Sequence, residues 1–166
     1  MEYRFHLDSP LGGITLASDG LALTGLWFDG QKHFGAGLSG DAGEQALPIF
    51  EETERWLQIY FEGHEPDFTP ALHPVGTPFQ QEVWALLRQI PYGETVSYGE
   101  LAARIAESRG LARFSAQAVG GAVGRNPISL LIPCHRVLGA DGSLTGYAGS
   151  VEKKAALLRL EGVVLR

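Results

Sequence analysis

The chain has 166 residues, 45% of them hydrophobic, and a formal net charge of −6, which is typical of a folded globular protein and excludes a disordered chain. Its single cysteine, Cys134, excludes an intrachain disulfide and a zinc site built from several cysteines. The sequence has no signal-peptide pattern and no apolar run of transmembrane length, so we expect a cytoplasmic protein without a membrane partner.

The charge is unevenly distributed along the chain. Residues 1–76 hold 12 acidic and 3 basic residues, a net charge of −9. Residues 77–166 hold 7 acidic and 10 basic residues, a net charge of +3. This difference in sign predicts two modules with different partners.

The first part of the chain is typical of a small antiparallel sheet followed by a helix. Tyr3, Phe5 and Leu7 alternate with polar residues, and further short apolar runs with turn signals between them continue to Phe28. Over residues 47–62 the apolar residues recur at helical spacing, which predicts an amphipathic helix.

A group of prolines separates this part from the next. Because proline restricts itself and the preceding residue to extended conformations, residues 63–77 are predicted to be a linker. The two predicted domains are therefore residues 1–62 and residues 78–166. The prolines are Pro66, Pro70, Pro74 and Pro78.

The second part is predicted to be mainly helical. Thr77 followed by Pro78 is typical of a helix N-terminus, and apolar residues at helical spacing continue to Ile90. A last helix is predicted near residues 151–161.

Two further helices are predicted between these. Ser97, with Glu100 three residues later, is a capping-box pattern at the start of one of them. A turn containing glycine at residues 108–114 leads to another short helix at residues 115–123. Two short helices around a tight turn are typical of a helix-turn-helix.

Cys134 is the first candidate for chemistry. A lone cysteine is most often a small buried hydrophobic residue. Here Pro133 prevents a regular helix or central strand, while His135 and Arg136 bring a base and a cation, which favour the thiolate. Because neighbouring side chains on extended backbone point in opposite directions, we expect a water molecule to bridge Cys134 and His135.

Other residues have two interpretations each. Asn126 serves either as a helix end and turn or as a brace for the cysteine loop. Gly120 and Gly121 indicate either tight helix packing or close approach of the backbone to a large ligand. Tyr98 and Tyr147 are either half-buried core residues or walls of a pocket that offer a hydroxyl group.

Several motifs are spread over residues 77–162, namely Thr77-Pro78-Phe79-Gln80, Ile90-Pro91-Tyr92-Gly93-Glu94-Thr95, Ser97-Tyr98-Gly99, Ala118-Val119-Gly120-Gly121-Ala122, Arg125-Asn126-Pro127-Ile128, Ile132-Pro133-Cys134-His135-Arg136-Val137, Thr145-Gly146-Tyr147-Ala148-Gly149 and Leu160-Glu161-Gly162. Together they closely resemble the O6-alkylguanine-DNA alkyltransferase family, whereas residues 1–62 match it only in general pattern. The resemblance implies an α+β fold. A small N-terminal α/β domain, ribonuclease H-like and with an antiparallel sheet, would precede a helical, winged-helix-like C-terminal domain with the helix-turn-helix.

The resemblance also implies a role for each matching residue. Cys134 would take the alkyl group from O6 of guanine by direct displacement, irreversibly and once per molecule. His135 would accept the thiol proton through a water molecule, and Glu161 would orient His135. Tyr98 would donate a proton toward the guanine ring, and Asn126 would brace the turn before the cysteine.

On the same basis the partner is double-stranded DNA containing O6-alkylguanine, with O4-alkylthymine as a second substrate. The nucleotide would be flipped out through the minor groove, which the small residues of the 115–123 helix would approach closely. Family members usually carry an arginine where this chain has Gln117, so we expect flipping to be weakened. The residues expected to contact substrate or DNA are Tyr98, Gln117, Ala118, Gly120, Gly121, Arg125, Arg136, Val137, Tyr147 and Ala148.

We expect no cofactor, because the protein would consume itself, and no metal, because the cysteine ligands of the N-terminal zinc site found in some family members are absent. A monomer is expected, and cooperative assembly on DNA is left open.

Three other functions are weighed against alkyl transfer. A lesion-binding alkyltransferase-like protein is disfavoured by the presence of Cys134. A helix-turn-helix regulator is disfavoured by the few long polar side chains of the 115–123 helix. A Cys-His hydrolase would require turnover of an ester.

Overall fold

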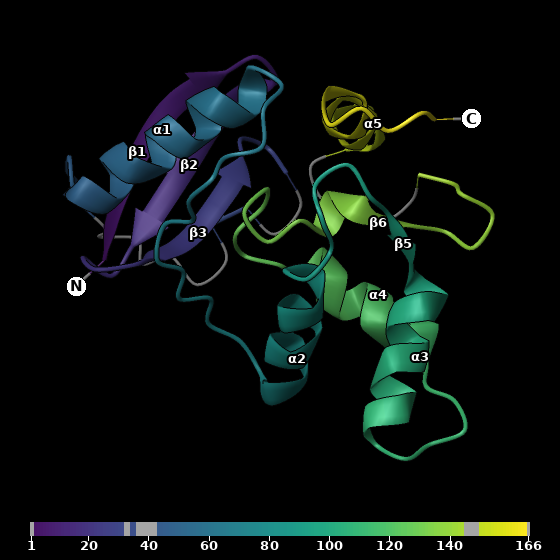
Figure 1. Ribbon diagram of the computed structural model, residues 1–166. Coiled ribbons are helices and arrows are strands. Elements are labelled where there is room, and N and C mark those ends of the chain that lie inside the picture. The colour runs from purple at the N-terminus through teal and green to yellow at the C-terminus, as the bar shows by residue number, and fades with distance from the viewer. Residues whose placement is uncertain (1, 32–33, 36–42, 145–149, 166) are drawn as a thin grey trace. The chain divides into compact units, whose positions relative to one another are not determined.

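The computed structural model describes residues 2–31, 34–35, 43–144 and 150–165 (Figure 1). The chain divides into two compact units. The first unit is Met1–Val75 together with Pro127–Leu131, and the second is Gly76–Asn126 together with Ile132–Arg166. The domain boundaries inferred from the prolines stay a prediction. The short segment Pro127–Leu131 is a feature of the first unit that the sequence did not suggest.

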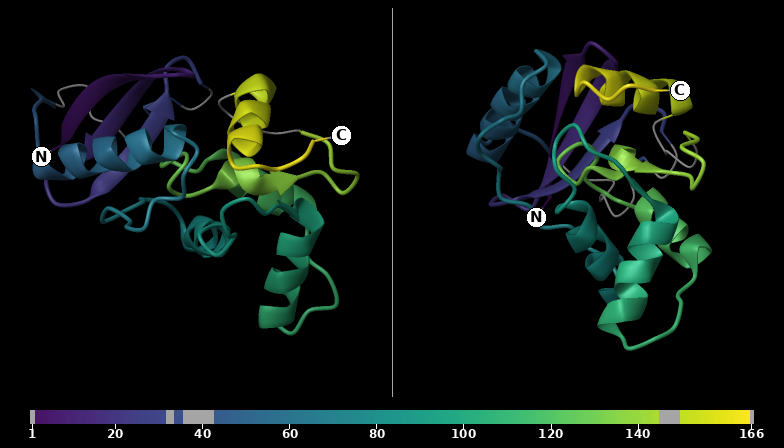
Figure 2. Two further views of the ribbon diagram at one scale, coloured as in Figure 1. Left: turned by 45° about the horizontal axis from the view of Figure 1, so that its top comes forward. Right: turned by 45° about the vertical axis from the view of Figure 1, so that its right-hand side comes forward.

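The first unit is built on an antiparallel meander covered by one helix. Its elements are β1 (Tyr3–Ser9), β2 (Gly12–Ser18), β3 (Leu23–Phe28), β4 (Gly43–Glu44) and α1 (Pro48–Phe61). The strand order is β3-β2-β1-β4, with only the short β4 parallel to its neighbour. Figure 2 shows α1 running along one face of the sheet, where Phe50 stacks on Phe5 with ring centroids 5.8 Å apart.

The outer edge of β3 is paired with two segments that are distant in sequence. Leu23 forms a parallel bridge with Leu72, which lies in the stretch predicted to be a linker. Leu26 forms a second parallel bridge with Ile128, and its backbone N–H donates to the carbonyl of Pro127 at 2.8 Å. These pairings satisfy backbone groups that an open edge strand would leave exposed.

The second unit is mainly helical. Its elements are α2 (Pro78–Leu87), β5 (Val96–Ser97), α3 (Tyr98–Ser108), α4 (Ala116–Gly124), the 3₁₀ turn η1 (Cys134–Arg136), β6 (Val137–Leu138) and α5 (Val151–Leu160). α3 and α4 form the helix-turn-helix, and β5 pairs in parallel with β6. The α+β class predicted from the sequence, with an antiparallel sheet in one unit and a helix-turn-helix in the other, is confirmed.

Local sequence explains where these helices begin. Thr77 accepts a hydrogen bond from the backbone of Gln80, whose side chain accepts one from the Thr77 N–H, a complete capping box. Ser97 and Ser115 cap α3 and α4 in the simpler way, each accepting a bond from a backbone N–H three residues later. Trp84 of α2 is buried, and its indole N–H donates to the carbonyl of Ala122 at 2.9 Å.

Across the part of the chain that the structure describes, no helix is long and apolar enough to cross a membrane.

Candidate active site

Two tight turns present Cys134. Pro133 has φ −80° and ψ 66°, and the N–H of Cys134 bonds the carbonyl of Ile132 at 2.8 Å, which is an inverse γ-turn. The 3₁₀ turn η1 follows directly, with the N–H of Arg136 bonding the carbonyl of Pro133 at 3.0 Å. The expectation of extended backbone at Cys134 is therefore wrong. The fixed φ of Pro133 suits a tight turn here. The thiol side chain is buried, at 7% exposure.

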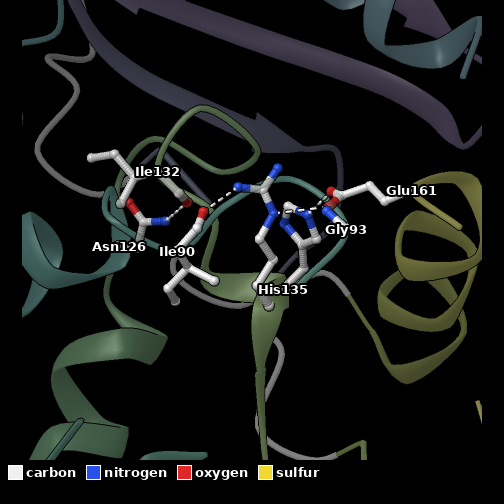
Figure 3. A network of polar contacts seen from close by, with 7 residues as sticks. Ile90, Gly93, Asn126, Ile132, His135 and Glu161 are labelled. Carbon is white, nitrogen blue, oxygen red and sulfur yellow. Dashed lines mark hydrogen bonds and ion pairs between the residues drawn. The ribbon is translucent and has the colours of Figure 1, made fainter. Parts of the chain in front are cut away.

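Asn126 connects the end of α4 to this turn. It lies just after the helix and is buried, and its Nδ2 donates to the carbonyl of Ile132 at 2.7 Å (Figure 3). The Asn126 side chain also forms a hydrogen bond with Cys134 that favours the thiolate. The geometry therefore matches the interpretation of Asn126 as a brace for the cysteine loop.

Glu161 and His135 form a completely buried pair. The Glu161 carboxylate, immediately after α5, lies 2.6 Å from His135 Nε2 through its Oε2. Its Oε1 accepts from Arg136 Nε at 2.9 Å and from the backbone N–H of Gly93 at 2.9 Å. Figure 3 shows His135 of the cysteine loop and Gly93 of the turn before β5 meeting at the Glu161 carboxylate. Three donors on one carboxylate fix both its position and its charge.

The protonation states follow from this arrangement. Burial alone would raise the pKa of Glu161, but the hydrogen bonds and charges of His135 and Arg136 outweigh it and leave that pKa well below its usual range. Burial lowers the pKa of His135, so its imidazole is neutral at neutral pH. We infer that Nε2 carries the proton and donates to Glu161, so Nδ1 is the atom that can receive a further proton.

Arg136 and Val137 both have buried side chains, and the contacts with substrate or DNA expected of them stay a prediction. The Arg136 guanidinium bonds Glu161 and, at 2.8 Å, the carbonyl of Ile90, and it lies 5.7 Å from the ring centroid of Tyr92. Its side chain is only 10% exposed, so it is not presented to a phosphate. The side chain of Val137 is buried where β6 pairs with β5. Arg136 is buried because the buried carboxylate of Glu161 requires a charged partner. Val137 is buried because its side chain is apolar.

Lys154 is a site residue that the sequence analysis missed. It lies on α5, is fully buried, and its Nζ is 5.9 Å from the ring centroid of Tyr98. Burial lowers its pKa to about 8, and its positive charge favours the Cys134 thiolate. One signal was available: Lys154 precedes Leu157 and Leu158 by three and four residues, so it occupies the apolar face of the predicted helix.

Tyr98 begins α3 and is half-buried. Burial raises the pKa of its hydroxyl, and negative charge on Cys134 raises it further. Two opposing effects act on the pKa of the Cys134 thiol. Burial raises this pKa, while Asn126 and Lys154 counteract part of the rise. In the described structure, Cys134 therefore interacts electrostatically with both Tyr98 and Lys154. The His135 and Glu161 pair lies beside this group.

The expected DNA-contacting residues of α4 form an exposed surface of small side chains. A Cβ added at Gly121 would meet no described atom within 4 Å, and one at Gly120 would meet only the Tyr98 ring at 3.8 Å, an ordinary contact. Tight helix packing therefore does not explain the two glycines. The exposed residues of this helix are Ala116, Gln117, Ala118 and Gly121, and its caps Ser115 and Arg125 are exposed as well. Tyr147 and Ala148 lie outside the described residues.

Within those described residues, no three His, Cys, Asp or Glu side chains lie together as a group that could hold a metal ion. The expectation of no cofactor stays a prediction.

Comparison with known proteins decides the family. The family model described as 6-O-methylguanine DNA methyltransferase, DNA binding domain, matches residues 78–163, and the model for its ribonuclease-like domain matches residues 3–74. The chain belongs to the 6-O-methylguanine DNA methyltransferase family. The family resemblance inferred from the motifs is thereby confirmed.

Relatives of the family support this over nearly the whole length. Methylated-DNA–protein-cysteine methyltransferase of Methanosarcina acetivorans is 44% identical over 96% of this chain and 98% of its own. The protein of the same name from Haemophilus influenzae is 41% identical over 97% and 87%. The crystal structure of Mycobacterium tuberculosis OGT in complex with DNA matches with a TM-score of 0.82 and 43% identity, covering 96% of this chain and 92% of that one.

Proposed function

We propose that Cys134 accepts the alkyl group of O6-alkylguanine in double-stranded DNA, through the buried network described above. The protein itself repairs DNA by direct transfer of a methyl group to a cysteine. Cys134 is the only cysteine of the chain, so no other residue can be that acceptor. The observation that carries the residue-level proposal is the buried Glu161–His135 pair at 2.6 Å, placed next in sequence to the thiol.

The proposed transfer is a single displacement. The Cys134 sulfur attacks the alkyl carbon, the bond between that carbon and O6 breaks, and a thioether forms. The thiol proton passes through a water molecule to Nδ1 of His135, and the charge of Glu161 stabilises the imidazolium that results. Because sulfur keeps the alkyl group, the protein acts once and no second step regenerates the thiol.

The leaving guanine is proposed to receive its proton from the Tyr98 hydroxyl. The electron pair of the broken bond would otherwise leave a negative charge on the guanine ring. The raised pKa of Tyr98 keeps its hydroxyl protonated and able to donate. Lys154, whose Nζ lies 5.9 Å from the ring of Tyr98, would stabilise the phenolate that remains.

We propose that α4 faces the minor groove. Its exposed small residues allow the backbone to approach DNA closely, and no atom of the described residues lies within 4 Å of a Cβ built at Gly121. The buried thiol cannot reach O6 of a stacked base, so the nucleotide must leave the duplex before transfer. Gln117 and Arg125 at the two ends of α4 are the longer side chains available there.

A mass-spectrometric transfer assay tests the proposal. After incubation with duplex DNA containing O6-methylguanine, the peptide containing Cys134 should gain one methyl group, and Cys134→Ser should gain none. A protein that binds this DNA and stays unmodified would contradict transfer and favour a lesion-binding role. Repeated turnover of an ester by Cys134 would instead indicate a hydrolase.

The oligomeric state, the compartment and the second substrate remain part of the proposal. We expect a monomer in the cytoplasm that also accepts the alkyl group of O4-alkylthymine. Sedimentation of the protein alone and on DNA of increasing length separates a monomer from cooperative assembly.

A further inference from the structure

The turn between α3 and α4 contains a cluster that the transfer chemistry does not use. The guanidinium of Arg109, the residue that ends α3, lies 5.2 Å from the ring centroid of Phe114 and 5.8 Å from that of Phe79. The two rings are 5.6 Å apart, and Arg109 Nη2 forms an ion pair with Glu82 Oε2 at 2.6 Å. We call these four residues the Arg109 cluster.

The cluster joins three helices at one point. Phe79 and Glu82 belong to α2, Arg109 ends α3, and Phe114 directly precedes Ser115, the N-cap of α4. One cationic side chain therefore holds the end of α3 and the start of α4 against the same face of α2. A guanidinium is suited to this because it stacks on aromatic rings and pairs with a carboxylate at the same time.

The rest of the turn is irregular and mostly exposed in the part of the chain that the structure describes. Gly110, which directly follows Arg109, has φ +67° and lets the N–H of Leu111 bond the carbonyl of Ala106 at 2.8 Å. Residues 111–115 then have no regular secondary structure, and all of them are exposed except the half-buried Phe114. The contact between Phe114 and Arg109 is thus the packed point of this turn.

We propose that Arg109 is a positioning residue for DNA repair: it fixes the turn before α4, and thereby the place of the first turn of α4 on the duplex. The inference rests on the proposed function, in which α4 faces the minor groove. Exposed ion pairs and cation–π contacts contribute little to the stability of a whole domain, so the effect is expected on the local conformation of the turn.

The main alternative is that Arg109 binds a DNA phosphate. Its guanidinium is already paired with Glu82 and stacked against two rings, which argues against a free phosphate ligand. The two roles predict different results for a charge-neutral change. Phe114→Leu removes one ring of the cluster and keeps every charge.

The experiment measures methyl transfer to duplex DNA at saturating DNA, the salt dependence of DNA binding, and the reaction with free O6-benzylguanine. Arg109→Met and Phe114→Leu should each slow transfer at saturating DNA by about fivefold, because a misplaced helix delays flipping. Both should react with O6-benzylguanine within about twofold of the original protein, since the Cys134 site is untouched. Arg104→Met, an exposed arginine on α3, is the matched control and should transfer normally at saturating DNA.

A phosphate contact would give another pattern. Arg109→Met would then weaken binding, reduce the salt slope by about 0.9, and recover full transfer at saturating DNA, while Phe114→Leu would have no effect. That pattern, or normal transfer by both variants, would overturn the proposal. If the unchanged protein failed to react with either substrate, the proposed function itself would fail, and this outcome is distinct from the others.

Discussion

At the scale of single residues, the site depends on one carboxylate with three donors. Glu161 pairs with His135 and Arg136 and accepts from the Gly93 N–H, and its side chain is completely buried. Without the negative charge, the one remaining carbonyl oxygen could not accept from all three donors. A buried cation and a buried imidazole cannot replace such a partner with water.

The first prediction concerns this carboxylate. Glu161→Gln presents an amide that cannot accept three hydrogen bonds from these donors, so we expect a loss of stability of about 3–5 kcal/mol. Transfer from O6-benzylguanine should also fall, by about 100-fold, because His135 loses the group that orients it. Urea unfolding and single-turnover kinetics measure the two effects. Glu152→Gln, on the exposed start of α5, is the control and should change neither.

The second prediction concerns Lys154 and pH. The transfer rate should rise as His135 loses its proton, at a pH below the ordinary value of 6.5, because only the neutral imidazole can accept the thiol proton. It should fall above pH about 8, where Lys154 loses the charge that favours the thiolate. Rates with O6-benzylguanine across this range test the profile. Lys154→Met should react slowly at pH 7 and lack the alkaline fall; an unchanged fall would exclude Lys154 as its cause.

The third prediction concerns the residue that departs from the family pattern. Gln117 is exposed at the start of α4 and is shorter than an arginine. Gln117→Arg should speed repair of duplex DNA, because a longer cation fills the space of the flipped nucleotide better. Reaction with free O6-benzylguanine should stay nearly unchanged. Equal acceleration of both reactions would reject a role in flipping.

At the scale of elements, α4 carries glycines that no described neighbour requires. Gly120 and Gly121 lie within the helix, where glycine costs stability relative to alanine. The glycines lower the stability of the helix and fill no packing need among the described residues. We infer that they keep the side chains on this surface small for a partner outside the chain. The same helix is held by its Ser115 cap and by the Trp84 bond to Ala122.

The fourth prediction separates these two properties. Gly121→Ala should stabilise the free protein by about 0.5–1 kcal/mol, because alanine is the better helix former and its methyl group meets no described atom. The same change should weaken duplex binding by placing that methyl group in the groove. Thermal unfolding and duplex titration measure the two effects, and reaction with O6-benzylguanine should be normal. Unweakened binding would mean that this face does not approach DNA.

At the scale of the whole molecule, stability should depend on pH through the buried charges. Glu161 has a folded-state pKa below its ordinary 4.5, so its contribution is complete above pH 4.5 and is lost as pH falls below that value. Lys154 behaves in the opposite way. Its folded-state pKa of about 8 lies below 10.5, so burial of its charge destabilises the fold below pH 8, and this cost disappears as pH rises toward 10.5.

The fifth prediction follows from that sign. Urea midpoints should fall steeply below pH 4.5 in the original protein. In Glu161→Gln the stability should be lower at neutral pH but less dependent on pH between 4.5 and 2, because the titrating group is gone. Identical acid dependence in the two proteins would show that other carboxylates dominate acid unfolding.

At the same scale, fewer basic side chains are available to contact DNA than the charge count of the sequence suggests. The sequence assigns +3 to residues 77–166 and −9 to residues 1–76. Arg136 and Lys154 are buried at the site, so two of the ten bases of the second part are not available to phosphates. We therefore expect modest, salt-sensitive binding to undamaged DNA.

Local chemistry in the sequence was sufficient for much of the fold. The helix predicted at 47–62 is found at Pro48–Phe61. The N-caps of α2, α3 and α4 are Thr77, Ser97 and Ser115. These features depend on residues within one or two turns of each other, where periodicity and capping act. The single cysteine beside histidine, with its flanking motifs, was likewise sufficient to indicate the family.

Only the tertiary structure decided which distant groups meet. It places Lys154 beside Tyr98, turns Arg136 inward onto Glu161 and Ile90, and pairs Ile128 with β3. No local pattern specifies these contacts, because a charged residue in sequence is by default solvent-exposed and becomes buried only where the fold supplies a partner. The sequence by itself thus determined the helices and the antiparallel meander, the family and the acceptor thiol. The packing of the chain determined which charges surround that thiol, since burial and pairing depend on neighbours far away in sequence.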